Sequence, residues 1–420
     1  MKEIAYQKGT LHLESASLEK LAKTYGTPLY VYSLKAILEN FRRVRDAFQA
    51  VSPLVAYSAK ANTNGAILRA LAKEGAGLDV VSGGELARGL KAGIPPEKII
   101  YAGVGKTAQE IQFAIESGIR AFNIESVPEA EQIARIARKL KKTARANLRI
   151  NPDVDAHTHA YISTGKKENK FGINFDQALD IFAAIAGLKG LVLDGIHAHI
   201  GSEILKTTPH LEALERLHEL IEALRAKGHA IRMLNLGGGF GIGYGDNEKP
   251  LDVPALGRKL MPVLQSLDCE VAFEPGRSVV GDAGLLLTRV LYVKKGSAKE
   301  FVIVDGGMND LIRPSLYGSY HRIQTVSEPN GSRARKVDVV GPICESGDFF
   351  AKDRPLPPLE EGDLLAVFDA GAYGFAMSSR YNSRPAPAEV LVSKGKAHLI
   401  RERETLDDLT SREIIPDILR

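Results

Sequence analysis

The sequence predicts an α/β protein in which a (β/α)8 barrel of the TIM type is followed by a mainly antiparallel β domain. Eight short apolar runs recur along the first two-thirds of the chain, and segments with apolar residues three and four apart lie between them. After about residue 277 the pattern changes to Val-, Leu- and Ile-rich runs separated by Gly, Pro and charged turns. A doubly wound sheet is the alternative for the first part.

The eight apolar runs are the predicted barrel strands, and the first four begin about 22 residues apart. They cover residues 55–60, 77–82, 99–103, 121–125, 146–151, 196–201, 234–240 and 271–276. Segments such as "AILRALAKEG", "GELARGLKAG" and "TAQEIQFAIESG" lie between runs and have Gly near their ends, which is typical of helices. A barrel of this kind carries its functional groups at the carboxyl ends of its strands.

The second part of the chain contains strand-like runs such as "LLLTRVLYVKKG", "KEFVIVDGG" and "PAEVLVSKGKAHLIRE". We therefore assign residues 28–277 to the barrel, and residues 1–27 plus 278–420 to a β-rich domain. The segment "SLEKLAKTYG" near the N-terminus is predicted to be a helix that could pack on either part.

Composition favours a small-molecule partner. The chain has 420 residues, 44% of them hydrophobic and 25% charged, with a net charge of +4, so neither nucleic acid nor a membrane surface is indicated. The start "MKEIAYQKGTLHLES" has no apolar signal core, and no run reaches about 18 apolar residues. We expect a cytoplasmic enzyme or binding protein. Cys269 and Cys344 lie far apart, so no disulfide framework and no metal site are expected.

Several chemically capable residues lie where predicted barrel strands end. They are Lys60, His199, the triplet Gly237 to Gly239, Glu274 and Arg277. The stretch "NLGGGFGIGYG" matches neither GxGxxG nor a P-loop, which argues against dinucleotides and nucleoside triphosphates. Each residue alone has a structural interpretation: a solvated rim lysine, a hydrogen-bonded histidine, a tight turn or a surface carboxylate.

Together these residues suit pyridoxal 5'-phosphate. Its aldehyde needs a lysine amine such as Lys60, and its ring nitrogen needs a carboxylate such as Glu274 that keeps it protonated. A flat side chain such as His199 can lie against the ring, and Gly-rich turns bring backbone amides close to a phosphate.

The motifs "YSAKAN", "HAHIGS", "LGGGFG" and "EPGR" resemble the signatures of the fold-type III pyridoxal-phosphate decarboxylases. The motifs "GMNDLIRPSLYGSYH" and "CESGD" narrow the resemblance to the diaminopimelate decarboxylase family, and "DAGAYGFAMSSRYNSRP" extends it to residue 385. The resemblance implies a carboxy-lyase that converts meso-2,6-diaminopimelate to L-lysine and carbon dioxide, the last step of lysine biosynthesis.

The resemblance also implies roles for individual residues. Lys60 would hold the cofactor, His199 would stack on its ring and Glu274 would pair with the ring nitrogen. The residues implied to bind the phosphate are Gly238, Gly239, Pro275, Gly276, Arg277, Ser202 and Tyr373. Asp79 and Arg149 resemble residues that support the ring in the wider fold type.

For the substrate, the resemblance implies that carboxylates are bound by Arg277, Arg313, Tyr317 and Tyr373, and the distal ammonium by Glu345. If "LIRPSLY" is helical, Arg313 and Tyr317 share a face. Cys344 would donate the proton after carbon dioxide leaves, because a thiol is mostly protonated at neutral pH. In the family this cysteine comes from the partner subunit, so a homodimer with active sites at the interface is implied.

One departure is Glu203, where the family commonly has Gln, which puts local contacts near the cofactor in doubt. The alternatives are a decarboxylase of the same fold acting on ornithine, arginine or carboxynorspermidine, an enzyme resembling alanine racemase, and a non-catalytic pyridoxal-phosphate-binding protein. The pair "CESGD" and "RPSLY" argues against the other decarboxylases.

Overall fold

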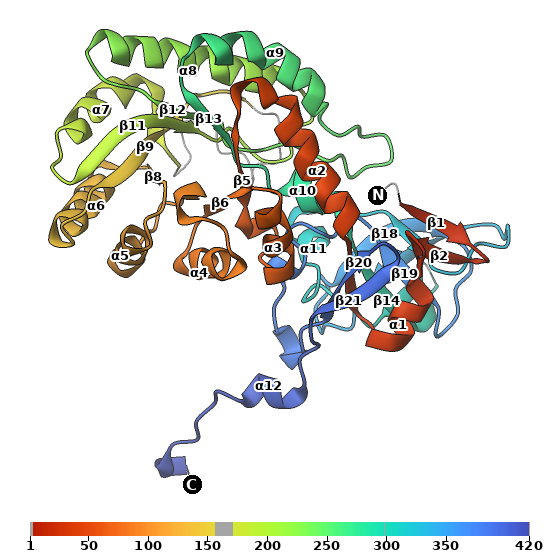
Figure 1. Ribbon diagram of the computed structural model, residues 1–420. Coiled ribbons are helices and arrows are strands. Elements are labelled where there is room, and N and C mark those ends of the chain that lie inside the picture. Colours follow the sequence, from red (N-terminus) through yellow and green to blue (C-terminus); the bar gives the residue numbers. More distant parts are fainter. Residues whose placement is uncertain (1–2, 156–170, 298, 420) are drawn as a thin grey trace. The chain divides into compact units, whose positions relative to one another are not determined.

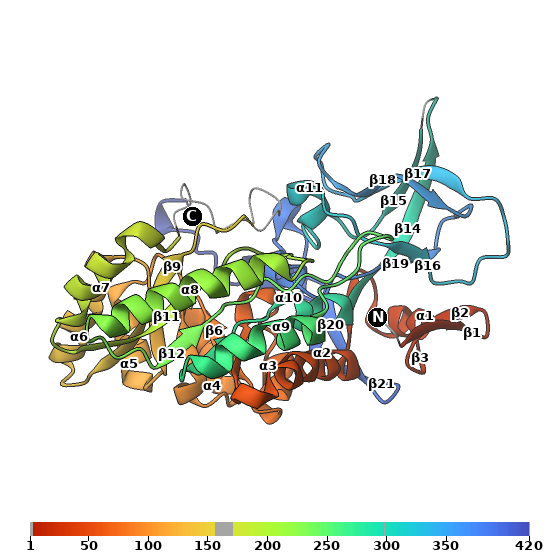
Figure 2. The ribbon, with the colours of Figure 1, turned by 90° about the horizontal axis from the view of Figure 1, so that it is seen from above.

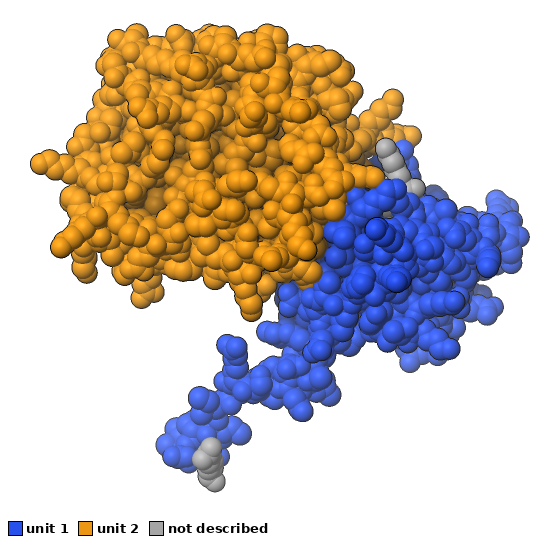
Figure 3. Space-filling model, viewed as in Figure 1, with its two compact units in different colours: residues 1–36, 244–246, 281–420 blue, residues 37–243, 247–280 orange. Residues whose placement is uncertain are grey.

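The computed structural model describes residues 3–155, 171–297 and 299–419. The chain divides into two compact units, coloured separately in Figure 3. Unit 1 comprises residues 1–36, 244–246 and 281–420, and unit 2 comprises residues 37–243 and 247–280. Each unit has its own sheet, so the two are described in turn.

Unit 2 is a closed parallel barrel of eight strands, as the sequence predicts. In order around the ring the strands are β5 (Leu54–Ser58), β6 (Gly77–Val80), β7 (Ile99–Tyr101), β8 (Ala121–Ile124), β9 (Ala144–Asn151), β11 (Leu191–Ala198), β12 (Met233–Asn235) and β13 (Glu270–Phe273). Pairing of β13 with β5, with Ala272 opposite Leu54, closes the ring. The short strand β10 (Ile173–Asn174) is added beside β9. All eight strands predicted from the sequence are confirmed.

The helices of unit 2 form an outer layer in which consecutive helices from α3 to α9 contact one another (Figures 1 and 2). They are α3 (Gly65–Lys73), α4 (Gly83–Ala92), α5 (Ala108–Ser117), α6 (Val127–Lys139), α7 (Ala178–Ala186), α8 (Thr208–Ala226) and α9 (Val253–Ser266), with α2 (Leu34–Ala47) before them and α10 (Arg277–Val280) after them. Short 3-10 turns are η1 (Gln49–Val51), η2 (Ala59–Ala61), η3 (Pro96–Lys98) and η5 (Phe175–Gln177).

Side-chain caps explain where several of these helices begin. Ser82, Thr107 and Ser126 each accept a hydrogen bond from a backbone amide in the first turn of α4, α5 and α6. A left-handed glycine, Gly93 or Gly118, ends α4 and α5. These local signals fix the strand-to-helix turns on which the candidate site lies.

Unit 1 contains a nine-stranded, mainly antiparallel sheet. Its strands are β4 (Leu29–Ser33), β14 (Gly284–Lys295), β15 (Glu300–Val304), β16 (Ile323–Thr325), β17 (Arg335–Val340), β18 (Phe349–Leu356), β19 (Leu364–Val367), β20 (Ala388–Ser393) and β21 (Lys396–Arg401). Two pairs, β4 with β20 and β15 with β17, are parallel. A small separate sheet contains β1 (Ile4–Gln7), β2 (Thr10–Leu13) and β3 (Ala16–Ser17).

The helices of unit 1 are short. They are α1 (Leu18–Tyr25), α11 (Arg313–Tyr317) and α12 (Leu406–Thr410), with 3-10 turns η6 (Gly281–Ala283), η7 (Phe375–Met377), η8 (Tyr381–Ser383) and η9 (Asp417–Leu419). The helix predicted for "SLEKLAKTYG" is α1, which packs on the small sheet. No helix in the described ranges is long and apolar enough to cross a membrane.

Strand β4 lies in unit 1, although the predicted barrel begins at residue 28. Its residues Leu29 and Val31 are buried in one core with Leu285 and Leu287 of β14 and Val390 of β20. The sequence is misleading here because an apolar run followed by helix α2 has the same pattern as a barrel repeat. The observed division therefore moves this boundary to residue 36.

Candidate active site

Lys60 lies at the carboxyl end of barrel strand β5. The strand ends at Ser58, and the 3-10 turn η2 that follows it carries Lys60 between the buried residues Ala59 and Ala61. The hydroxyl of Tyr57 donates to the carbonyl oxygen of Asn62 at 3.0 Å, which fixes the turn from below. The backbone position of Lys60 is therefore fixed by its two buried neighbours. It lies at the end of the barrel where enzymes of this fold carry their active sites.

Asp79, at the end of β6, is a buried carboxylate near Lys60. Its Oδ2 accepts a hydrogen bond from the hydroxyl of Ser58, and its Oδ1 has no hydrogen-bond partner among the described residues. Burial, and after it the negative charge of Glu274, raise the pKa of Asp79 to about 7 against the opposing charge of Lys60. Asp79 is thus close enough to both groups to respond to their charges.

Glu274 follows β13 and is held by three hydrogen-bond donors. Its Oε1 accepts from the side-chain amides of Asn123 at 3.1 Å and Asn235 at 2.5 Å, and its Oε2 lies 3.1 Å from Nε2 of His197. Burial by itself raises the pKa of this carboxyl, but the charge of His197 and the hydrogen bonds of His197 and Asn235 lower it to about 2. Glu274 is therefore a carboxylate at neutral pH.

His199 lies two residues beyond His197, at the end of β11. Its Nδ1 is 3.2 Å from the backbone nitrogen of Gly238, so Nδ1 accepts this N–H and the ring proton of the neutral form is on Nε2. Burial lowers the pKa of His199 well below its usual value, and the charges of Lys60 and Arg149 lower it further. The side chain is a neutral, flat ring at neutral pH.

The glycine triplet after β12 forms a turn that only glycine fits. Gly237 and Gly239 have φ of +65° and +88°, in the left-handed region. A Cβ atom at Gly238 would collide with the carbonyl oxygen of Glu274, and one at Gly239 would collide with the carbonyl of Gly201. The turn is therefore packed backbone against backbone, and only residues without a side chain can form it.

The "EPGR" segment completes this part of unit 2. The carbonyl of Pro275 accepts the N–H of Ser58 at 3.0 Å, and a Cβ at Gly276 would lie 2.9 Å from the Cβ of Ser58. Arg277 begins α10 and is buried, and its Nη2 donates to Oγ of Ser202 at 3.2 Å. A backbone hydrogen bond and close packing therefore hold the end of strand β5, which Lys60 follows, against the "EPGR" segment.

Arg149 and Glu203 were also singled out from the sequence. Arg149 forms a buried ion pair of 2.8 Å with Glu125, and Oε2 of Glu125 accepts the N–H of Gly172 at 2.9 Å. Glu203 has φ of +67°, an uncommon conformation for a residue with a side chain. It directly follows Ser202 in the turn after β11.

The predicted substrate residues Arg313 and Tyr317 lie in unit 1. They begin and end the short helix α11, so the condition under which the two residues share a helix face is met. Arg313 is only 1% exposed; its Nη1 donates to the hydroxyl of Tyr244 at 2.5 Å and its Nη2 to Oγ of Ser319 at 3.1 Å. Tyr317 is half-buried.

Cys344 and Glu345 are exposed in the loop after β17. The backbone nitrogen of Cys344 donates to Oδ1 of Asn382 at 2.9 Å. The loop is shaped by Asp348, whose two carboxylate oxygens accept the N–H groups of Met308 and Ile343, each at 2.6 Å. One buried carboxylate therefore joins the "GMND" motif to the "CESGD" motif.

Tyr373 has φ of +56°, which is a genuine outlier for an aromatic residue. It is half-buried in the "DAGAYG" segment, where Asp369 also has positive φ. Backbone strain of this kind persists only where neighbouring structure holds it, and it is concentrated at functional sites.

Nine of the predicted cofactor residues belong to unit 2 and the remaining site residues to unit 1. The first set is Lys60, His199, Ser202, Gly238, Gly239, Glu274, Pro275, Gly276 and Arg277, and the second is Arg313, Tyr317, Cys344, Glu345 and Tyr373. Sequence reasoning missed the side chains that hold Glu274. The sequence hint to these side chains is a polar residue inside an otherwise apolar strand, as in "AFNIE", "IHAHIG" and "LNLGGGF".

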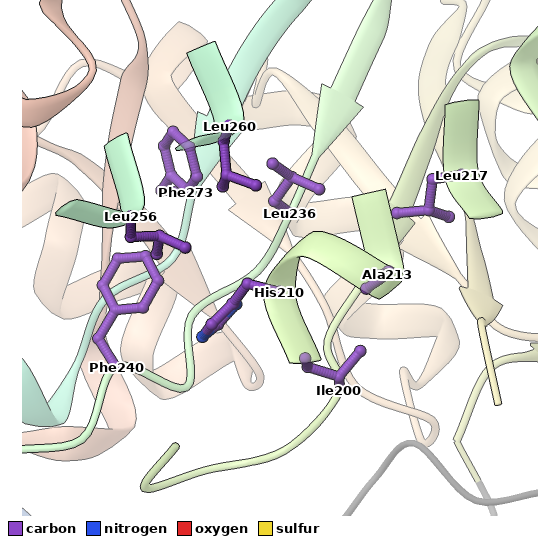
Figure 4. Close-up of a pocket in the computed structure, with 10 residues that line it drawn as sticks. Ile200, His210, Ala213, Leu217, Leu236, Phe240, Leu256, Leu260 and Phe273 are labelled. Carbon is purple, nitrogen blue, oxygen red and sulfur yellow. The ribbon is translucent and has the colours of Figure 1, made fainter. Parts of the chain in front are cut away.

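A small apolar cavity of about 10 Å³ lies between the barrel wall and helices α8 and α9. Its lining includes Ile200, Leu236, Phe240 and Phe273, and the buried ring of His210 lies among these apolar side chains (Figure 4). Burial lowers the pKa of His210 to about 4. The cavity is at the lower limit for one water molecule, so it is a packing defect and cannot hold a cofactor.

Comparison with known proteins identifies the family. The pyridoxal binding domain of pyridoxal-dependent decarboxylases matches residues 34–281. Diaminopimelate decarboxylases from Zymomonas mobilis and Pseudomonas aeruginosa are 46% and 48% identical to this chain, each across 98% of it and 99% of the relative. The chain belongs to the diaminopimelate decarboxylase family. It is accordingly a carboxy-lyase with pyridoxal 5'-phosphate as its cofactor.

Solved members of the family have the same fold. Diaminopimelate decarboxylase from Helicobacter pylori, complexed with L-lysine, is 44% identical with a TM-score of 0.90, over 94% of this chain and 98% of that one. The M. jannaschii enzyme, also complexed with L-lysine, is 38% identical with a TM-score of 0.94 over 99% of both chains. The predicted fold class is therefore confirmed.

The residues of unit 2 fit the cofactor that the family requires. Lys60 acts electrostatically on Asp79, a buried carboxylate whose Oδ1 has no hydrogen-bond partner within the described ranges, and the ionised carboxylate of Glu274 lies at the same end of the barrel. At Gly238 and Gly239 the backbone packs so closely on the carbonyl groups of Glu274 and Gly201 that no side chain fits, as in the glycine-rich turns that bind phosphates. These are the amine, the carboxylate and the amide-lined turn that pyridoxal phosphate needs.

Proposed function

We propose that this chain decarboxylates meso-2,6-diaminopimelate to L-lysine and carbon dioxide, the last step of lysine biosynthesis. The observation that carries the proposal is 46–48% identity, over at least 96% of the chain, to relatives named diaminopimelate decarboxylase. Two solved relatives are described as complexes with L-lysine, the proposed product. A lysine decarboxylase from Selenomonas ruminantium is only 26% identical, which favours diaminopimelate over a substrate with one amino acid end.

Each cofactor residue has a physical role in the proposal. Pyridoxal phosphate supplies an electron sink for the electrons of the carbon–carbon bond that breaks. Lys60 would be the attachment amine, the ionised Glu274 would hold a proton on the ring nitrogen, and the neutral, flat ring of His199 would pack against the cofactor ring. The phosphate ligands are Gly238, Gly239, Pro275, Gly276, Arg277, Ser202 and Tyr373.

The substrate and proton roles are drawn from the family resemblance. Arg277, Arg313, Tyr317 and Tyr373 bind carboxylates, since a guanidinium can grip a carboxylate with two parallel hydrogen bonds. Glu345 binds the distal ammonium and Cys344 delivers the proton to the reacting carbon. The exposure of both residues is consistent with a site that a second subunit completes. We accordingly propose a homodimer, located in the cytoplasm.

The test of the cofactor assignment is chemical labelling of Lys60. Borohydride reduction of the loaded enzyme should fix the cofactor on one peptide, and mass spectrometry should locate the added pyridoxyl mass on Lys60. The Lys60→Ala variant should lose the label and at least about 10³-fold in kcat. Lys91→Ala, at an exposed lysine of α4, is the matched control and should keep both. A label on another lysine, or an active Lys60→Ala enzyme, would reject the assignment.

A further inference from the structure

Four polar side chains lie inside the barrel of unit 2 beside Glu274, where the interior is otherwise mostly apolar. They are Asn123 of β8, Asn147 of β9, His197 of β11 and Asn235 of β12, each no more than 1% exposed. Burying a polar side chain costs free energy unless its hydrogen bonds are made. Four of them on neighbouring strands therefore need a reason beyond packing.

The hydrogen bonds among these residues converge on the carboxylate of Glu274. Asn123, Asn235 and His197 donate to it, and Asn147 donates to Oδ1 of Asn123 at 2.9 Å, which fixes the direction of the Asn123 amide. Every contact of the Glu274 carboxylate described here is with a donor. The arrangement therefore suits a carboxylate and disfavours its protonated form.

Asn235 also contacts the glycine turn. Its Oδ1 accepts the N–H of Gly237 at 2.9 Å while its Nδ2 donates to Glu274. The carbonyl oxygen of Gly237 in turn accepts the N–H of Glu274 at 2.7 Å. One side chain and one backbone hydrogen bond thus join the turn after β12 to the residue after β13.

We infer that His197 and Asn235 are positioning residues, which hold Glu274 as an oriented carboxylate and link it to the glycine turn before the cofactor binds. The inference rests on the proposed function, in which Glu274 faces the ring nitrogen and the turn binds the phosphate. If Glu274 and the glycine turn are already fixed in the apoprotein, less conformational entropy is lost when the cofactor binds. A fixed charge opposite the ring nitrogen also needs no reorganisation during the reaction.

A second buried carboxylate makes this support necessary. Asp79 and Glu274 act on each other electrostatically, and each would favour protonation of the other. The charge and the hydrogen bond of His197, together with the hydrogen bond of Asn235, keep the pKa of Glu274 low in spite of its burial. Without them, burial would raise the pKa of Glu274, and its carboxylate would be less able to hold a proton on the ring nitrogen.

Isosteric variants separate this role from a purely structural one. Asn235→Asp replaces the donor to Glu274 with an oxygen of the same shape and places two carboxylates in contact. His197→Leu removes the donor, whereas His197→Gln can restore it because the Gln amide nitrogen takes the place of Nε2. The matched controls are Asn64→Asp, at a helix cap where Asp serves equally well, and His210→Gln, at the buried histidine of the apolar cavity.

Two readouts are compared at pH 6 and pH 8: the dissociation constant of pyridoxal phosphate from the apoprotein, and kcat. At pH 8, Asn235→Asp and His197→Leu should each weaken cofactor binding by at least about tenfold, the effect of one hydrogen bond to a charged group. Asn235→Asp should recover part of the loss at pH 6, where the two carboxylates share a proton, and His197→Leu should not. His197→Gln and both controls should remain within about threefold of wild type, well below the loss expected for one such hydrogen bond.

Values for Asn235→Asp and His197→Leu within twofold of their controls would overturn the inference. So would equal losses for His197→Gln and His197→Leu, because the donor would then be irrelevant. The variant Glu274→Gln distinguishes a failure of this inference from a failure of the proposed role of Glu274. If Glu274→Gln is inactive while the positioning variants match their controls, only the inference fails; if Glu274→Gln matches wild type, the proposed role of Glu274 fails with it.

Discussion

Asp79 and Glu274 are two buried carboxylates of one barrel end whose surroundings move their pKa values in opposite directions. Burial raises the pKa of Asp79 to about 7, whereas the donors around Glu274 lower its pKa to about 2 in spite of burial. Carboxylates separated in this way take different roles. Glu274 is suited to hold a charge permanently, and Asp79 can exchange a proton near neutral pH.

The raised pKa of Asp79 predicts a pH dependence of apoprotein stability. Folded Asp79 keeps its proton to about pH 7, whereas in the unfolded chain it loses the proton near the usual value of 3.8. The contribution of protonated Asp79 to the free energy of unfolding is therefore complete below about pH 4, and it is lost as the pH rises to about 7. The Asp79→Asn variant has no such group and should not lose this stability. For a difference of about three pKa units between the folded and unfolded chain, the loss in wild type amounts to up to about 4 kcal/mol.

Urea unfolding of the apoproteins at pH 5 and pH 8 measures this effect. The free energy of unfolding of Asp79→Asn should rise relative to wild type between the two pH values. Asp176→Asn, at an exposed aspartate of the same unit, should parallel wild type. Parallel behaviour of Asp79→Asn as well would show that Asp79 is already ionised at pH 5.

At the scale of elements, the glycine turn that follows β12 is the proposed binding site for the phosphate of the cofactor. Gly238 has no space for a side chain because the carbonyl of Glu274 occupies the position of its Cβ. Gly238→Ala must displace either this turn or Glu274. We expect it to weaken binding of pyridoxal phosphate by at least about 100-fold, since both contact points move together.

The matched control for Gly238→Ala is Gly187→Ala, which ends α7 in the same unit and has open space around its Cβ position. Equilibrium titration of both apoproteins with pyridoxal phosphate gives the comparison. The control should bind as wild type does. Wild-type affinity in Gly238→Ala would mean that the turn does not contact the cofactor.

The sequence predicts elements best where local signals agree. The eight barrel strands follow from apolar runs that end in small or polar residues, and α4, α5 and α6 follow from caps and spacing. Strand β4 was placed in the wrong unit because its partners, β14 and β20, lie more than 250 residues away in sequence. Such long-range pairing leaves no local trace.

Some residues of the candidate site could be predicted from the sequence and others could not. Lys60, His199 and Glu274 could be found because they follow strand-like runs and match motifs of the family. The supporting residues Asn123 and Asn235 could not, because a single polar residue in an apolar run does not reveal its direction or its partner. Only the closed barrel brings four strands together around Glu274.

At the scale of the whole molecule, the proposed homodimer predicts that inactive variants complement each other. Lys60→Ala and Cys344→Ala remove residues proposed to meet across the subunit interface. After mixing and exchange, half of the dimers are mixed, and each mixed dimer has one intact site. Activity should therefore rise to about a quarter of the wild-type value.

Matched controls for subunit exchange are Lys60→Ala mixed with Lys60→Ala, which should stay inactive, and Cys269→Ala in place of Cys344→Ala, which should be active before mixing. Cys269 is the other free cysteine and directly precedes β13. Mixed dimers demonstrated by mass but without recovered activity would place Lys60 and Cys344 in the same subunit's site.

The proposed reaction can be tested by analysis of its products. Purified enzyme loaded with pyridoxal phosphate is given meso-2,6-diaminopimelate, ornithine or arginine, with Lys60→Ala as the blank. We predict L-lysine and carbon dioxide in equal amounts from diaminopimelate, and a kcat/KM at least about 100-fold lower for the other two, which leave carboxylate-binding groups unpaired. Lysine release no greater than the blank, or faster decarboxylation of ornithine or arginine, would rule out the proposed reaction.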